Sequence, residues 1–120
     1  MPTLRRQFGD KGEDLAVEYL KKRGYTILDR NFQTQRGEID IIAEKDKKIF
    51  FVEVKSRRND FFGDAIESIT DQKKEKIYRT AFAYLEKKNI PEERDWQIDV
   101  ITIDFLENPP KIEYYESPFF

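Results

Sequence analysis

Residues 37–55 read GEIDIIAEKDKKIFFVEVK, and this stretch decides the fold. Residues 38–43 and 49–55 are two β-prone runs, rich in isoleucine, valine and phenylalanine. The charged residues 44–48 between them are typical of a turn, so the pattern predicts two strands that pair as an antiparallel hairpin. Both runs are stronger strand candidates than the short β-prone stretch that precedes them at residues 25–30.

Charged side chains gather on one face of each predicted strand. Successive side chains of a strand point to opposite faces, so Glu53 and Lys55 share a face while Val54 points away. Glu38 and Asp40 likewise share a face, and we expect three apolar residues of their strand on the opposite one: Ile39, Ile41 and Ala43. Antiparallel pairing would place Asp40 beside Glu53 and Lys55, so that two carboxylates and one ammonium group surround a common point.

The rest of the chain predicts two helices and three more strands around the hairpin. Apolar residues recur at helical spacing in two segments, which we expect to be helices: residues 8–22 and 66–89. Three segments have the composition of strands: residues 25–30, 96–105 and 111–116. The order α-β-β-β-α-β-(β) describes an α/β sandwich with a mixed sheet, since a crossover through a helix permits parallel pairing of neighbouring strands.

Composition restricts both the number of domains and the chemistry. A chain of 120 residues with 10 Phe and 6 Tyr can form one compact domain, which we expect to span residues 1–120. The chain contains no His and no Cys, which excludes Ser–His triads, His-based acid–base pairs, thiol nucleophiles and disulfides. The remaining carboxylate and lysine chemistry suits hard cations such as Mg²⁺, which prefer oxygen ligands.

Hydropathy and charge indicate where the protein is located and what it binds. No stretch approaches the roughly 20 apolar residues of a membrane span, so we expect a cytoplasmic protein with no membrane partner. The net charge is −2, but residues 1–80 contain 18 basic and 15 acidic residues whereas residues 81–120 contain 4 and 9. The basic clusters of the first part could meet the phosphates of a nucleic acid, although solvated surface charge is the more common reading of any single cluster.

The predicted cluster of Asp40, Glu53 and Lys55 fits metal-assisted phosphoryl chemistry. Asp40 and Glu53 would hold Mg²⁺, which polarises a phosphoryl oxygen and lowers the pKa of a bound water. Lys55 would orient or deprotonate the attacking water and offset the charge of the phosphate. The alternative is that these are ordinary exposed charges on an open sheet face, which is common in a chain with 38% charged residues.

Two further charged residues lean toward the apolar stripes of the predicted helices. Glu13 lies one helical turn from Ala16 and two from Leu20, at the edge of the buried stripe. Its alternative explanation is that the helix dipole favours a carboxylate near an N-terminus. Lys73 lies on the apolar stripe of the second helix, where the alternative is a packed stem with the ammonium group in water. The inward charges together favour a site over a chance arrangement.

Several short motifs resemble the YraN-type family. They are Gly12-Glu13, Arg30-Asn31, residues 37–42 (GEIDII), residues 51–57 (FVEVKSR), Phe62-Gly63 and Glu67-Ser68. This bacterial family is assigned to the PD-(D/E)xK restriction-endonuclease-like superfamily and is similar to archaeal Holliday-junction resolvases. The resemblance extends over residues 8–103. It departs from the family pattern at residues 97–100, which read QIDV where the family often has RFDV.

The resemblance implies a restriction-endonuclease-like α-β-β-β-α-β core with a mixed central sheet flanked by helices. It implies six site residues: Asp40, Glu53 and Lys55 as metal-binding and catalytic residues, Glu13 as a helix-borne carboxylate, and Glu38 and Lys73 as auxiliaries. The implied cofactor is Mg²⁺ or Mn²⁺, with Asp40, Glu53 and Glu13 as its ligands.

Two functions of different classes follow from these residues. The first is a metal-dependent endonuclease acting on DNA, with branched or repair and recombination intermediates as expected substrates and Arg57 and Arg58 as contacts to the nucleic acid. A resolvase-like activity would need a homodimer to cut symmetric strands. The alternative is a nucleic-acid-binding accessory protein on the same scaffold with weak or no catalysis. A domain that binds no nucleic acid is a third hypothesis, which the clustered inward charges disfavour. The apolar tail at residues 117–120 packs either on its own domain or on a partner.

Overall fold

The computed structural model describes residues 4–57 and 69–119, with the backbone alone for residues 4–10. Several sequence expectations therefore lie outside the described residues: the nucleic-acid contact Arg58, the motifs Phe62-Gly63 and Glu67-Ser68, and the predicted start of the second helix at residues 66–68.

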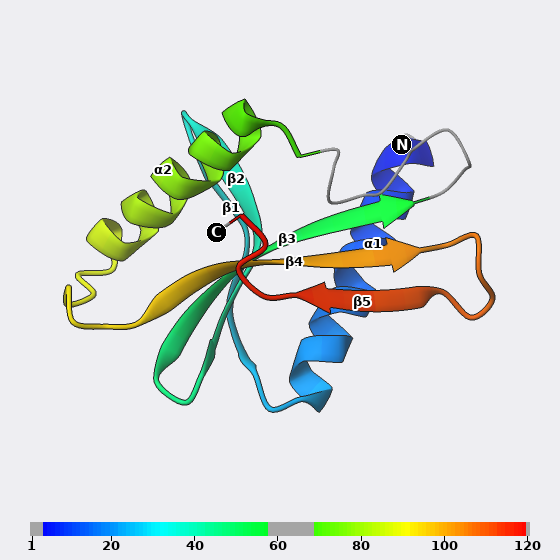
Figure 1. Ribbon diagram of the computed structural model, residues 1–120, viewed down its shortest axis with the longest axis horizontal. Helices are drawn as coiled ribbons and strands as arrows, with labels where there is room; N and C mark the ends of the chain where they lie inside the picture. Colours follow the sequence, from blue (N-terminus) through cyan, green and yellow to red (C-terminus); the bar gives the residue numbers. More distant parts are fainter. Residues whose placement is uncertain (1–3, 58–68, 120) are drawn as a thin grey trace.

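The elements of the described ranges follow the predicted order. They are α1 (Leu4–Lys22), β1 (Thr26–Thr34), β2 (Gly37–Lys45), β3 (Lys48–Arg57), α2 (Asp71–Lys87), β4 (Trp96–Asp104) and β5 (Lys111–Tyr115). The strands form one sheet in the order β1-β2-β3-β4-β5 (Figure 1). Strands β3 and β4 are parallel and the other neighbours antiparallel, because α2 carries the chain back between β3 and β4. The α-β-β-β-α-β core with a mixed sheet is therefore confirmed.

The two helices cover opposite faces of the sheet (Figure 1). The core under α2 contains Phe32, Ile39, Ile42, Ile49, Phe51, Ile77, Ala81, Tyr84 and Ile98. The core under α1 contains Ala16, Val17, Leu20, Ile41, Phe50, Val52, Ile101 and Ile103. Neither helix of the described ranges has the length and apolar content needed to cross a membrane.

Helix α2 begins later than the apolar periodicity predicts. Thr70 has an extended backbone and caps the helix, since its Oγ1 accepts a hydrogen bond from the backbone N–H of Lys73 at 3.2 Å. Ile69 is buried but precedes the helix instead of forming part of its stripe. The apolar spacing predicts a helix that includes Thr70, but the Thr70 side chain caps the first turn. The helix therefore begins at Asp71.

Asp99 ties the end of the chain to the sheet. Its carboxylate is fully buried and accepts hydrogen bonds from the Gln97 side chain at 2.7 Å, from the Ser117 backbone N–H at 3.0 Å and from the Tyr114 hydroxyl. Burial raises the pKa of Asp99, and these three donors oppose that rise. Phe119 then packs against the core under α2, so this part of the apolar tail lies on the chain's own fold.

Candidate active site

Strand β3 directs Glu53 and Lys55 toward α2. Phe51 packs in the core under α2 whereas Phe50 and Val52 pack under α1, so the predicted alternation holds along this strand. Glu53 and Lys55 continue the face of Phe51 beyond the edge of the core, where both side chains are half-buried. The strand thereby presents a carboxylate and an ammonium group on a rigid element beside the first turns of α2.

The regular alternation of side chains between the two faces of the sheet is interrupted at facing positions of β1 and β2. Ile39 packs under α2 and Ile41 under α1, although residues two apart in a regular strand share a face. The prediction that Ile39 and Ile41 share a face is therefore wrong. The facing strand is kinked at the same level, because Asn31 has a φ of 54° and lies between the partner pairs Arg30–Ile41 and Phe32–Ile39. Asparagine tolerates this left-handed conformation better than most residues.

Asp40 occupies this point of irregularity. The regular pairing of β2 with β3 reaches Ile41 and Val52, and beyond it the Asp40 carboxylate accepts a hydrogen bond from the backbone N–H of Val54 at 2.8 Å. The Asp40 side chain thus accepts a hydrogen bond from the Val54 backbone N–H, which lies beyond the regular β2–β3 pairing. The Asp40 carboxyl group also hydrogen-bonds to that of Glu53, so the two predicted carboxylates are in contact.

Burial raises the pKa values of both carboxyl groups, and their contact raises that of Glu53 while it lowers that of Asp40. Burial raises the pKa of Glu53 well above its ordinary value, and the negative charge of Asp40 raises it further. Burial also raises the pKa of Asp40, against the opposing effect of the Val54 N–H. Such a pair favours a shared proton or a cation between its oxygens. Carboxylate oxygens are the donors that Mg²⁺ and Mn²⁺ prefer, so the pair fits the predicted ion.

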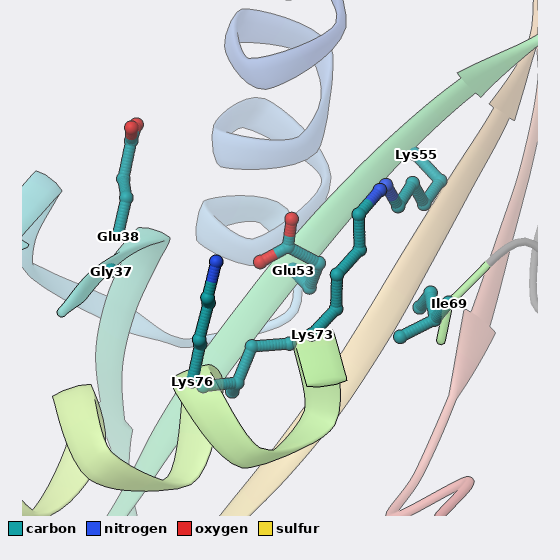
Figure 2. A pocket seen from close by; sticks show the side chains of 8 residues that line it. Gly37, Glu38, Glu53, Lys55, Ile69, Lys73 and Lys76 are labelled. Atoms are coloured by element: carbon teal, nitrogen blue, oxygen red, sulfur yellow. The ribbon is translucent and has the colours of Figure 1, made fainter. Parts of the chain in front are cut away.

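Lys55 experiences the opposite shift. Burial lowers the pKa of its ammonium group, the nearby Lys73 lowers it further, and the negative charge of Glu53 partly restores it. Figure 2 shows the Lys55 and Lys73 side chains pointing toward each other from β3 and α2. The Lys73 side chain is exposed, but its amino group lies close enough to Lys55 for its positive charge to lower the Lys55 pKa.

A hollow of about 250 Å³ opens in front of these groups (Figure 2). Its lining comes from β2, β3, α2 and the residue before the α2 cap: Gly37, Glu38, Glu53, Lys55, Ile69, Lys73, Lys76 and Ile77. Ile69 and Ile77 form the apolar part of the lining. Lys55, Lys73 and Lys76 form its basic part. Sequence reasoning missed Lys76, although its position three residues after Lys73 on a helix places the two on neighbouring turns.

Gly37 lets α2 approach the start of β2. A Cβ atom built at Gly37 would lie 2.9 Å from Oγ1 of Thr80 and 3.4 Å from the backbone oxygen of Lys76. Thr80 is fully buried and donates its hydroxyl hydrogen to the backbone oxygen of Lys76 at 2.8 Å, so it has little room to move. The glycine that opens the GEIDII motif therefore keeps α2 and its lysines close to the carboxyl pair.

Glu38 lines the same hollow as Glu53, and its negative charge adds to the effect of burial in raising the pKa values of Asp40 and Glu53. Glu38 is exposed, accepts a hydrogen bond from the Gln33 side chain at 3.2 Å, and points its carboxylate away from Glu53 (Figure 2). Glu13, on α1, lies with an oxygen 3.9 Å from a guanidinium nitrogen of Arg30. In residues 4–57 and 69–119, no three acidic side chains are grouped to hold a metal ion. The structure thus brings Asp40 and Glu53 together, and the assignment of Glu13 as a third ligand stays a prediction.

Arg57 extends the charged edge of β3. It lies two residues after Lys55 on the same strand, and its guanidinium group is 3.8 Å from the Asp104 carboxylate of β4. The pair is partly exposed, so this contact contributes little to stability. Arg57 places a guanidinium group near the end of the strand that carries Glu53 and Lys55.

Comparison with known proteins places the chain in a family. Residues 12–103 match the model of the uncharacterised protein family UPF0102. The chain belongs to the UPF0102 family. This confirms the YraN-type resemblance seen in the sequence.

UPF0102 proteins of several bacteria are similar to this chain over most of their length. The UPF0102 protein of Brachyspira hyodysenteriae is 41% identical over 117 residues, covering 96% of this chain and 97% of the relative. That of Alkaliphilus oremlandii is 42% identical over 97% of this chain and all of the relative. That of Clostridium acetobutylicum is 48% identical over 86% of this chain and 84% of the relative. The UPF0102 match includes every described residue of the candidate site.

Proposed function

We propose that this UPF0102 protein is a metal-dependent endonuclease that hydrolyses phosphodiester bonds in DNA. The observation that carries the proposal is the contact between the Asp40 and Glu53 carboxyl groups, both with raised pKa values, next to the amino group of Lys55. Two half-buried carboxyl groups in contact, one with a pKa well above its ordinary value, are costly for a fold unless a cation or substrate binds them. Phosphoryl transfer requires charged groups held in fixed positions, and here rigid strands hold two carboxyl groups and an amino group side by side.

The two carboxylates are the groups that would hold the cofactor. Asp40 and Glu53 offer oxygen donors, and Mg²⁺ or Mn²⁺ bound there would supply Lewis-acid polarisation of a phosphoryl oxygen. The hydrogen bond from the Val54 backbone N–H fixes the orientation of the Asp40 carboxylate.

Lys55 is suited to act on the attacking water. Its lowered pKa increases the fraction of neutral amine at physiological pH, and only the neutral amine can accept a proton. A water molecule would lose a proton to Lys55 Nζ while its oxygen forms a bond to phosphorus. The bond from phosphorus to the leaving sugar oxygen breaks in the same displacement, and solvent protonates that oxygen. Lys73 assists by keeping the Lys55 pKa low, and it balances phosphate charge.

The proposed substrate is DNA with a branched or otherwise interrupted duplex, as in repair and recombination intermediates. The lysines of the hollow, with Arg57 and Arg58, would contact backbone phosphates. A homodimer would allow paired cuts on symmetric branches. The accessory-protein alternative draws support from the net charge of −2, since a small basic surface on an acidic protein predicts weak nonspecific affinity at physiological salt.

Cleavage of a substrate panel tests the proposal. Labelled four-way junction, flap, duplex and single-stranded DNA, with an RNA single strand, are incubated with the protein in Mg²⁺ or Mn²⁺ or in EDTA. We expect cleavage of at least one DNA that requires the metal and is abolished by Asp40→Asn and by Lys55→Ala. Lys111→Ala, on the exposed part of β5, is the matched control and should cleave like wild type. Absence of cleavage on every substrate, with wild type folded and binding DNA, would contradict the enzyme and favour the accessory protein.

A further inference from the structure

A second hollow of about 500 Å³ adjoins the candidate active site. It lies between the β1–β2 turn and the middle of α2 and is lined by Thr34, Gln35, Arg36, Arg79, Phe82, Ala83 and Glu86. Gly37 and Lys76 line the first hollow, whereas the neighbouring residues Arg36 and Arg79 line the second. The two hollows are therefore successive along α2, and the tip of the β1–β2 hairpin lies beside that helix (Figure 1).

Phe82 presents an aromatic ring to this second hollow. It is 56% exposed, the largest exposed fraction among the large apolar side chains that the structure leaves uncovered in its described part. Its ring contacts Trp96 edge to face, with the ring centroids 5.4 Å apart. The contact holds the ring in place while leaving much of it open to solvent. An exposed, fixed aromatic ring is a platform on which a planar ligand can stack.

Cationic side chains connect this ring to the site. Lys73, Lys76, Arg79 and Phe82 follow one another at intervals of three residues on α2. Each step advances about 4.5 Å along the helix axis and turns by about 60° around it, so the four side chains form a row that winds around the helix. Arg36 adds a guanidinium group from the facing turn. Arg79 pairs with Glu75 at 2.5 Å, but both side chains are more than half exposed, so the pair contributes little and can be exchanged for a phosphate.

We propose that this second hollow binds an unpaired nucleotide of the substrate, with the base on Phe82 and the adjoining phosphates on Arg79 and Arg36. The strand would then continue past Lys76 to the carboxyl pair. A stacked base must be free of its partner, so the site selects nucleic acid with a single-stranded segment over continuous duplex. The proposal rests on the proposed nuclease function and deepens it by naming the substrate class.

The chemistry of the lining favours a nucleotide over a protein segment. Two guanidinium groups and one carboxylate, that of Glu86, line the hollow with the ring, which leaves a net positive charge. A nucleotide carries both a planar apolar face and a negative charge. The apolar residues around Phe82 on its other side, Leu85, Ile90 and Pro91, line a different hollow toward Trp96. Phe82 lines that hollow too, so the two occupants differ in the other residues they need: a protein partner would depend on Leu85 and Ile90, whereas a nucleotide would depend on Arg79 and Arg36.

Binding without cleavage tests the proposal. Fluorescence anisotropy in EDTA compares a labelled single-stranded oligonucleotide with the duplex of the same sequence. Phe82→Leu, which keeps apolar contact with Trp96 but loses the π-face, should weaken binding of the single strand about tenfold and leave duplex binding unchanged. Phe82→Tyr should bind the single strand like wild type. Arg79→Gln should weaken single-strand binding and lower its salt dependence by about one phosphate contact.

Matched controls and a parallel cleavage assay separate the two proposals. Leu106→Ala removes another exposed apolar side chain and Arg23→Gln removes an arginine of the α1 end, and both should bind like wild type. Single-strand binding by Phe82→Leu equal to that of wild type, or an equal loss on duplex, overturns the nucleotide site even if the protein cleaves DNA. Selective loss in Phe82→Leu together with no cleavage by wild type keeps the binding site and overturns the nuclease.

Discussion

The ionised carboxyl group of Glu53 destabilises the folded protein. It is half-buried against Asp40, and its pKa is raised by burial first and by the Asp40 charge second. The folded protein therefore holds this proton more tightly than the unfolded chain does. Stability from the protonated form is fully present below the ordinary glutamate pKa of 4.5 and is lost as the pH rises through the raised pKa.

Glu53→Gln should therefore stabilise the protein while removing its proposed activity. An amide has no charge to lose, and its NH₂ group can donate to the Asp40 carboxylate. We expect a gain of about 0.5–2 kcal/mol at pH 7 to 8 that shrinks toward pH 4, measured by urea unfolding over a pH series. The exposed Glu92→Gln is the control and should show no such trend. Identical pH dependence in Glu53→Gln and wild type would contradict the description of the pair.

At the scale of elements, the kink in β1 and the end of β2–β3 pairing lie at one level of the sheet. Asn31 adopts a positive φ opposite Asp40, and there the Asp40 carboxylate takes the place of a backbone acceptor for Val54. The irregularity thus lies at the position of the Asp40 carboxylate. Backbone geometry, and not only side-chain identity, therefore makes the site.

Substitutions of Asn31 test the role of this kink. Asn31→Gly keeps access to positive φ and should retain both fold and cleavage. Asn31→Val places a β-branched residue in a strained conformation, so we expect a loss of about 1–3 kcal/mol in denaturant unfolding and loss of cleavage. Asp46→Val, at a φ of 50° in the β2–β3 turn, is the matched control. It should lose similar stability and keep cleavage. Full activity in Asn31→Val would show that the kink does not position Asp40.

Much of the fold was predictable because its signals are local. Alternation along residues 49–55 correctly assigned Glu53 and Lys55 to one face, and the hairpin pattern correctly brought Asp40 to Glu53. The flip at Asn31 was not predictable, since periodicity assumes a regular strand. The second hollow and Lys76 depend on how α2 docks against the β1–β2 turn, which is a tertiary property. Apolar periodicity alone extends α2 past Thr70, because it takes no account of a threonine side chain that caps the helix.

At the scale of the whole molecule, the charges form two regions along the chain. The basic side chains of both hollows belong to residues 1–80, with 18 basic and 15 acidic residues, whereas residues 81–120, which include β4 and β5, hold 4 and 9. The hollows lie where α2 meets the sheet, and α1 covers the opposite face. Substrate recognition on this account is confined to one side of the sheet.

We propose that Asp40 and Glu53, which hold a proton in the free protein, would hold a divalent cation during DNA cleavage. The direct test is the Mn²⁺ concentration that gives half-maximal cleavage, measured at a series of pH values in single-turnover reactions. Protons and the cation compete for the same oxygens, so this concentration should fall as the pH rises, and Asp40→Asn should show no cleavage at any Mn²⁺ concentration. Cleavage that needs no metal, or a half-maximal concentration that is the same at every pH, would contradict the account.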